Sequence, residues 1–382
     1  MPEAKMRDGI IQRGTTWSYV IRERDAQTGK ARPRWVGGFS TRTAAKKARD
    51  AARHAVNRGT YVAPQDLTVA DYLRRWVEAH AVALKPSTAK SYRDNIERYL
   101  IPRLGHERVQ SLSPSLLSLV LRDLYEKGGV GGKALSPRTV EFARAVLRKA
   151  MDDAVIDRII EVNPVVGTKS PKTVKPHHTV WSSAELRRFL TATEGQPFSA
   201  IWVLAAGTGM RRGELLALRW AQVDLEAGVV VVERSVTSIS RELHYVTTKN
   251  HERREVPIDS RTTAQLRAWR KTQTAERLAW GTAYKDNDGL VFTWENGAPV
   301  SGDYVTKQFV RAQGLADVPR ITLHEVRHTH ASILLREGVP VHVVSARLGH
   351  KDASVTLNVY AHHIPEDSTR VLDVFSRAVW GA

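Results

Sequence analysis

The chain contains no cysteine, which excludes disulfide bonds and thiolate metal sites and is compatible with a reducing compartment. No run of residues approaches the ~18 apolar residues that a membrane-spanning helix needs. The first nine residues also lack the apolar stretch of a secretory signal. We therefore expect a cytoplasmic protein with no membrane partner.

Acidic residues are too few to balance the basic ones. The chain has 58 Lys and Arg against 40 Asp and Glu, a net charge of +18, which favours a polyanionic partner such as nucleic acid. Residues 1–62 alone hold 14 Lys or Arg against 5 Asp or Glu, so half of the excess lies in this segment. We expect a separate DNA-contacting module there, with Arg22, Arg24 and Arg34 as candidate contacts; a solvated basic face is the alternative.

At 382 residues and 42% hydrophobic composition, the chain can form two or three domains. Residues 9–38 alternate like short strands, and Thr41 is placed to cap a helix over 42–57. These features predict a small ββ-β-α module over residues 1–62.

Helical periodicity begins at Thr68, which with Asp71 resembles a capping box. Ser87 is expected to start a second helix and Ser136 with Pro137 a third. An all-α domain over 63–165 results. The third helix has an apolar stripe made of Val140, Ala143, Leu147, Met151 and Ala154.

A proline-containing basic linker is predicted over residues 166–178. The stretch 163–178 holds three prolines, three lysines and no acidic residue, so it is stiffened and attracts phosphates. Lys169, Lys172 and Lys175 are the candidate DNA contacts. Residues 179–382 read as a mixed α+β domain, with helices from Ser183 and around Arg211, a sheet over about 229–258, and helices afterwards.

Two polar clusters in this last region could support chemistry. In AAGTGMRRGELLALRW, a turn with two glycines aims Arg211, and Glu214 is expected to orient that arginine from behind. In YVTTKNHERREVPI, two short strands around a polar turn predict a β-hairpin with Lys249 near its tip.

A third cluster lies near the C-terminus, in LHEVRHTHASILLREG and ARLGHKDASVTLNVYAHH. His324, Arg327, His350 and Tyr360 fall within 37 residues. A phenol with a pKa of about 10 is a poor nucleophile at neutral pH, so a reactive tyrosine needs neighbours that stabilise negative charge or accept its proton. The basic groups of this cluster could do both.

These residues resemble the tyrosine recombinases of the phage-integrase family. The family's pattern of Arg, Lys, His-x-x-Arg, His and Tyr is filled in order, within the contexts TGMRxGE, HxxRHTHAS and LGH. The matching positions are Arg211, Lys249, His324, Arg327, His350 and Tyr360. Glu325, where Asp is commoner in the family, is a mild departure.

The resemblance implies the fold, the reaction and the partners. It implies a multidomain α+β protein with an arm-type N-terminal module, a SAM-like core-binding domain and a catalytic domain. Tyr360 would form a 3′-phosphotyrosyl link, Arg211 and Arg327 would clamp the phosphate, and Lys249 would protonate the leaving 5′ oxygen. No cofactor or metal is expected, because the tyrosyl ester retains the energy of the phosphodiester.

The implied partners are double-stranded DNA attachment sites and other copies of the chain. The copies would form a synaptic tetramer that passes through a Holliday junction, so the protein would be nucleoid-associated when bound. A directionality factor and a DNA-bending protein could assist. Integration of a viral genome or of another mobile element is the expected outcome.

Other functions stay open at this point. A Xer-type resolvase of chromosome dimers uses the same chemistry, but the basic N-terminal module argues against it, as it does against a type IB topoisomerase. His324-Glu325-Val326-Arg327-His328 also satisfies H-E-x-x-H, the zinc metalloprotease pattern, which leaves the other clusters without a task. A DNA-binding protein without catalysis is the remaining alternative.

Overall fold

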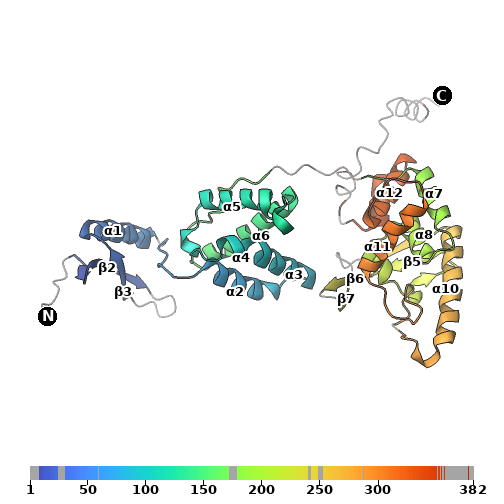
Figure 1. Ribbon diagram of the computed structural model, residues 1–382, viewed down its shortest axis with the longest axis horizontal. Coiled ribbons are helices and arrows are strands. Elements are labelled where there is room, and N and C mark those ends of the chain that lie inside the picture. The colour runs from blue at the N-terminus through green and yellow to red at the C-terminus, as the bar shows by residue number, and fades with distance from the viewer. Residues whose placement is uncertain are drawn as a thin grey trace. The chain divides into compact units, whose positions relative to one another are not determined.

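The computed structural model describes residues 8–24, 31–58, 60–171, 179–239, 242–247, 253–286 and 288–350, together with the single residues 352, 354, 357 and 377. The chain divides into two compact units, Met1–Lys175 and Pro176–Ala382. Figure 1 labels their helices and strands. None of the described helices is long and apolar enough to cross a membrane.

The N-terminal module is a three-stranded antiparallel sheet covered by one helix. The strands are β1 (Ile10–Arg13), β2 (Thr16–Arg24) and β3 (Ala31–Phe39), in that order across the sheet, and the helix is α1 (Arg42–Arg58). The Thr41 hydroxyl accepts the Ala44 amide at 3.1 Å, as expected of a helix cap. The strands and the helix predicted here are confirmed.

The helical domain contains α2 (Val69–Ala81), α3 (Pro86–Asn95), α4 (Ile101–Leu104), α5 (Pro114–Lys127) and α6 (Pro137–Ile156). The predicted starts at Thr68 and Ser136 are confirmed, since both hydroxyls accept amides of the first turn. The second helix begins at Pro86, one residue earlier than predicted, because proline suits the first helical position. All five residues of the apolar stripe on α6 are buried.

Two buried side chains fasten α2 to α6. The Tyr72 hydroxyl donates to the Ala150 carbonyl at 2.7 Å, and Trp76 Nε1 donates to Asp153 Oδ2 at 2.7 Å. Each contact satisfies a polar atom on a ring that otherwise packs in the core. These two hydrogen bonds therefore fix the position of α2 along α6 within the packed core.

The second unit is mixed α+β. Its helices are α7 (Ser183–Ala192), α8 (Ser199–Thr208), α9 (Arg212–Leu216), α10 (Ser260–Trp280), α11 (Gly302–Ala312), α12 (Leu323–Arg336) and α13 (Val341–Leu348). Its strands are β4 (Val223–Asp224), β5 (Val229–Val232), β6 (Arg234–Ile239), β7 (Glu242–Thr247) and β8 (Arg254–Pro257). The predicted helix from Ser183 is confirmed, with a Ser182–Glu185 capping box at its start.

The hairpin predicted around Lys249 is wrong, because the strands on either side of it belong to different sheets. β7 pairs with β6 in a two-stranded sheet, whereas β8 pairs with β5 in a three-stranded sheet of order β4-β5-β8. Burial explains the choice: Val230 and Val256 lie opposite each other and are fully buried, while no described side chain of β6 or β7 is. Lys249 itself lies outside the described residues.

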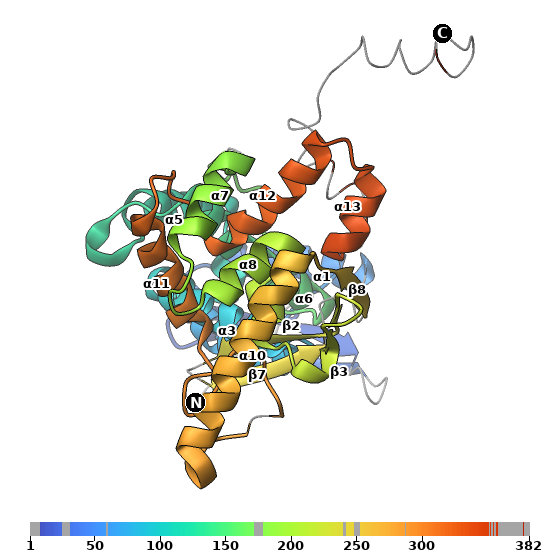
Figure 2. The ribbon, with the colours of Figure 1, turned by 90° about the vertical axis from the view of Figure 1, so that its right-hand side faces the viewer.

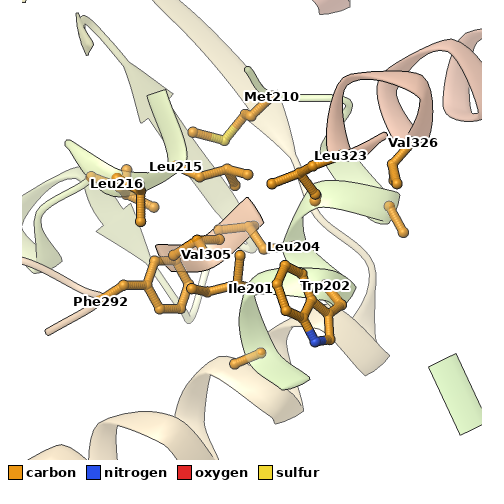
Figure 3. Close-up of a cluster of buried hydrophobic side chains, with 14 of the residues drawn as sticks. Ile201, Trp202, Leu204, Met210, Leu215, Leu216, Phe292, Val305, Leu323 and Val326 are labelled. Carbon is orange, nitrogen blue, oxygen red and sulfur yellow. The ribbon is translucent and has the colours of Figure 1, made fainter. Parts of the chain in front are cut away.

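Helix α8 lies at the centre of the core of the second unit. Its apolar residues share one buried cluster with side chains from α9, α11 and α12, and Figure 3 labels Leu323 and Val326 of α12 among them. Helix α13 lies beside α12 (Figure 2), and a smaller cluster that includes Leu335 and Leu348 joins the two. Packing of apolar side chains thus places both α8 and α13 against α12.

Gly213 provides a test of the contact between α9 and β6. A Cβ at this position would lie 2.5 Å from Ser235 Oγ and 2.6 Å from the Val236 carbonyl oxygen. The Val236 carbonyl is part of the β6 backbone, which cannot shift without a cost in stability. We predict that Gly213→Ala destabilises the protein by about 2 kcal/mol, because overpacking outweighs the better helix propensity of alanine. Thermal melting would show this as a fall of several degrees.

Gly314→Ala is the matched control, since nothing lies within 4 Å of a Cβ built at Gly314. Its melting temperature should equal that of the wild type. Equal melting temperatures for both variants would contradict the close approach of α9 to β6.

Candidate active site

A tight turn after α8 presents Arg211. Gly209 ends the helix with φ of 64°, in the left-handed region that favours glycine. A Cβ there would also lie 2.7 Å from Leu348 and 2.9 Å from His330, so only glycine allows this approach. Two positions later Arg211 caps α9. We call residues 207–211 the α8–α9 turn.

Glu214 fixes Arg211 from behind, as the sequence predicted. Its carboxylate accepts the Arg211 amide at 2.9 Å and Arg211 Nη1 at 2.8 Å. The Glu214 side chain is 2% exposed, whereas that of Arg211 is 34% exposed. The pair therefore has a buried anion and a cation that still reaches solvent.

Arg254, on β8, is a second partner of Glu214 that the sequence reasoning missed. Its Nη2 donates to Glu214 Oε2 at 2.6 Å, and its Nε donates to the Arg347 carbonyl at 3.1 Å. Burial by itself would raise the pKa of Glu214, but the hydrogen bond and charge of Arg254, with those of Arg211, outweigh burial and lower that pKa. Glu214 is therefore a stable carboxylate at neutral pH.

Arg327 joins two turns through their main chains. It lies on α12 and is buried, and it donates through Nη1 to the Gly209 carbonyl and through Nη2 to the Leu348 carbonyl, both at 2.8 Å. We call residues 347–350, which include Leu348, the α13 turn. The planar fork of the guanidinium matches two carbonyls that lie side by side, so lysine could not replace it.

Arg347 and His330 form a second bridge between the same turns, and neither was predicted. Arg347 Nε donates to His330 Nε2 at 3.1 Å, and His330 Nδ1 lies 2.8 Å from the Ala206 carbonyl. Because Nε2 accepts, Nδ1 must carry the proton. Arg347 Nη2 also donates to the carbonyls of Gly207 and Pro257 at 2.7 and 2.9 Å.

His350 follows Gly349, whose φ of 66° turns the chain after α13. The His350 amide donates to the Ser345 carbonyl at 3.1 Å. Burial lowers the pKa of His350 to about 4, and the charges of Arg327 and Arg211 act in the same direction. The imidazole is therefore uncharged at neutral pH.

His324 lies in the first turn of α12, where a capping box starts the helix. Thr322 Oγ1 accepts the Glu325 amide at 3.3 Å, and the Glu325 carboxylate accepts the Thr322 amide at 2.6 Å. The His324 and His328 rings meet edge to face at 4.9 Å. The H-E-x-x-H match thus uses its glutamate as a helix cap, and no group of three or more potential metal ligands occurs among the described residues.

Four of the six predicted catalytic residues lie in the described structure, and three of them meet at the two turns. Arg211 and Arg327 act directly on the pKa of His350, and His324 contributes to the same shift. Lys249 and Tyr360 fall outside the described residues. The described groups alone form a basic site around a neutral imidazole, an arrangement suited to stabilising negative charge on a phosphate.

Arg22 and Arg34, two of the arginines predicted to contact DNA, lie on opposite faces of the N-terminal sheet. Arg22 is exposed on β2, opposite Pro33, whereas Arg34 pairs with the buried Ile21 and so lies on the face covered by α1. Arg34 Nη2 donates to the Pro64 carbonyl at 3.1 Å, a contact within the protein. Of Arg24 only the backbone is described.

Among the predicted linker contacts, Lys169 is exposed. Lys172 and Lys175 lie outside the described residues.

Two family profiles match the chain. Residues 181–367 match the phage integrase family, and residues 68–118 match the phage integrase N-terminal SAM-like domain. A tyrosine recombinase XerC-like protein of Caldanaerobacter subterraneus subsp. tengcongensis is 27% identical, with 88% of this chain and 90% of the relative covered. The ICEBs1 integrase of Bacillus subtilis is 25% identical, with 76% of this chain and 77% of the relative covered.

Solved structures share the fold at low identity. The Tn1549 transposon integrase in complex with transposon right end DNA has a TM-score of 0.66 at 23% identity, covering 80% of this chain and 98% of the other. A lambda integrase dimer bound to a COC′ core site has a TM-score of 0.59 at 18% identity, covering 96% of this chain and 97% of the other.

The Glu214–Arg254 pair leads to a prediction about stability. Arg254→Met leaves a buried carboxylate with one cationic partner, so we expect a loss of about 3 kcal/mol in unfolding free energy. Glu214→Gln combined with Arg254→Met should be more stable than the sum of the single changes indicates. Denaturant unfolding of the four proteins of this cycle measures the coupling.

Arg253→Met is the control, because the neighbouring Arg253 pairs with Glu255 on the surface, where both side chains are 63% exposed. It should change the unfolding free energy by less than about 1 kcal/mol. Equal effects at positions 253 and 254 would contradict the role of Arg254.

His330 gives the protein a defined pH dependence. Burial and the Arg347 charge lower its pKa from 6.5 to about 4 in the folded state. Between pH 6.5 and 4 the unfolded chain binds this proton while the folded one resists it, so stability is complete above pH 6.5 and falls as the pH drops. The loss amounts to about 3 kcal/mol.

His330→Gln, which cannot titrate, should lose less stability than the wild type over that pH range. Thermal melting of both proteins at pH 7.5 and pH 5 measures the difference. Parallel losses in the two proteins would show that His330 is not the titrating group.

Proposed function

The chain belongs to the phage integrase family of tyrosine recombinases, enzymes that cleave and rejoin DNA strands, and from this membership we propose that it is the recombinase that integrates and excises a mobile genetic element. The observation that best supports this proposal is the meeting of Arg211, Arg327 and His350 at the two turns. A phosphate placed there would face two guanidinium groups and a neutral imidazole.

In the proposed reaction, the Tyr360 hydroxyl oxygen attacks the scissile phosphorus. The bond from phosphorus to the 5′ oxygen breaks, and a 3′-phosphotyrosyl link forms. His350, which is uncharged at neutral pH, is the proposed acceptor of the phenolic proton, because the negative charge that develops on the phosphate would raise its lowered pKa during the transfer. Lys249 is the proposed donor of the proton that the departing 5′ oxygen takes up.

Arg211 and Arg327 are the proposed phosphate clamp, with His324 at its edge. The two arginines have different surroundings: Arg211 is partly exposed, while Arg327 is buried and holds both turns. In the transition state, charge develops on the non-bridging oxygens, and donors already fixed by the fold need no reorganisation to meet it. Resealing is the same set of steps in reverse, with a new 5′ hydroxyl as the nucleophile.

The choice of a mobile element over chromosome-dimer resolution rests on the N-terminal module. Its sheet and basic helix lie ahead of the SAM-like match, in the segment with half of the chain's excess positive charge. Similarity to the ICEBs1 integrase and to an integrase of Streptomyces ambofaciens, 27% identical over 86% of this chain, favours the same choice. A Xer-type resolvase is the second candidate, favoured by the XerC-like relative.

The proposed partners are double-stranded attachment sites and further copies of the chain. A lambda integrase tetramer bound to a Holliday junction has a similar fold, with a TM-score of 0.58, and supports a synaptic tetramer. A directionality factor and a DNA-bending protein remain part of the proposal. The exposed Arg22 and Lys169 are the described basic residues proposed to contact DNA.

A covalent adduct tests the chemistry. The purified protein is incubated, in EDTA, with a suicide substrate that carries the DNA flanking its own gene and a nick near the crossover. We predict a detergent-resistant protein–DNA adduct on the 3′ phosphate that is absent with Tyr360→Phe, because phenylalanine lacks the attacking oxygen. The nick lets the leaving strand diffuse away, so resealing cannot hide the intermediate.

The control is DNA binding by Tyr360→Phe, which should match the wild type because the change removes one hydroxyl. Failure of the wild type to form an adduct on DNA that it binds would contradict a recombinase and favour a DNA-binding protein. Proteolytic activity abolished by EDTA would favour the H-E-x-x-H reading instead.

A further inference from the structure

The second unit has a cleft at the end of α8 that lies away from the α8–α9 turn. It measures about 540 Å³ and is bounded by the N-terminal end of α8, by α10, by the turn that begins at Trp294, and by the start of α11. Helix α8 has ten residues, so the cleft and the candidate active site are about 15 Å apart along its axis. The cleft is therefore separate from the site proposed to bind the scissile phosphate.

Aromatic rings form one wall of this cleft. Trp294 and Tyr304 have ring centroids 4.5 Å apart, and Phe198 meets both rings edge-on, at 6.2 and 5.8 Å. Phe198 adopts φ of 68°, a strained conformation for a residue with a side chain. Trp294 is 37% exposed, so part of its ring is open to a ligand.

Main-chain hydrogen bonds hold the turn that carries Trp294 and Glu295. The Gly297 amide donates to the Trp294 carbonyl at 2.8 Å, and the Trp294 amide donates to the Ala298 carbonyl at 2.8 Å. Gly297 has φ of 78°, and a Cβ there would meet the Lys285 carbonyl oxygen at 2.3 Å. The aromatic wall is thus preformed, which lowers the entropy lost on binding.

Among the described residues that line the cleft, two are carboxylates and none is a lysine or arginine. Within the described part of the chain, Glu276 Oε2 is buried and has no hydrogen-bond partner. Burial raises the pKa of Glu276, and the nearby Glu295 carboxylate raises it further. A cation bound between the two carboxylates would offset both the cost of burying Glu276 and the repulsion from Glu295.

These features select a flat or compact organic cation. Aromatic faces attract guanidinium and ammonium groups, and the carboxylates pair with them, whereas phosphates of DNA would be repelled. We propose that this cleft is a docking site for an arginine or lysine side chain of a second copy of the chain. The inference rests on the proposed function, because recombination requires copies to assemble on DNA.

Charge favours a second copy as the occupant. Each copy has a net charge of +18, so copies repel one another, and their assembly needs local contacts between acidic and basic surfaces. The chain supplies 58 Lys and Arg as possible occupants. Because the cleft and the candidate active site are at opposite ends of α8, docking leaves the active site open to DNA.

Cooperative binding to DNA tests the proposal. Gel shifts with fragments that contain one or two core-type sites give the affinity for the first copy and the gain for the second. We expect Glu276→Gln with Glu295→Gln to lower this cooperativity about tenfold, since a desolvated cation pair is worth roughly 1–2 kcal/mol. The affinity for a single site should stay within about twofold, because a cleft lined by carboxylates offers no favourable contact to phosphates.

Further variants and a melting measurement make the result specific. Glu226→Gln removes one exposed carboxylate of the same unit outside the cleft and should leave cooperativity unchanged. Trp294→Ala should repeat the loss, and Trp294→Phe should retain part of the cooperativity, because phenylalanine keeps a weaker aromatic face. The melting temperature of the double glutamine variant should equal or exceed that of the wild type, since the change removes a buried charge without a partner.

The outcomes separate this inference from the proposed function. Unchanged cooperativity in the double variant would overturn the docking site, even where the wild type forms the covalent adduct on a single site. Absence of the adduct from the wild type would instead overturn the proposed chemistry. Lower cooperativity with full adduct formation on a single site is the result that the docking site predicts.

Discussion

The contacts of the buried carboxylate of Glu214 set the geometry of the candidate active site. Its two oxygens bind Arg211 from the α8–α9 turn and Arg254 from β8, and Arg254 reaches on to the α13 turn through the Arg347 carbonyl. Arg327 completes the arrangement by donating to the Gly209 and Leu348 carbonyls, and Arg347 does so by donating to the Gly207 carbonyl. Because each guanidinium presents several donors in one plane, one side chain can fix two segments at once.

This arrangement explains how so much positive charge can be concentrated before DNA arrives. Main-chain carbonyls and one carboxylate satisfy the buried guanidinium groups, so their burial leaves few unpaired donors. The same charges, together with burial, keep the His350 imidazole neutral. The site can therefore attract a phosphate and still hold an uncharged imidazole. Chemistry of this kind depends on donors that are fixed in advance more than on any single strong contact.

Local signals in the sequence predicted local structure well. The helix from Ser183, the glycine turn before Arg211 and the capped helices of the first unit depend on residues a few positions apart. The pairing of the strands on either side of Lys249 was predicted wrongly, because pairing depends on which faces share a core. Arg254 and Arg347 were missed for a related reason: their partners are 17 to 140 residues away in sequence, and no local pattern marks them. The spacing of the family motif could identify the reacting residues but not the groups that position them.

The most direct test of this account is amide hydrogen exchange of the two turns in the protein without DNA. The amides of Gly209, Arg211, Gly349 and His350 all donate hydrogen bonds within the protein. If the guanidinium groups hold the site together in advance, these amides should be protected to a similar degree with and without a bound core-site fragment. Rapid exchange in the free protein that slows only when DNA binds would contradict a preassembled site.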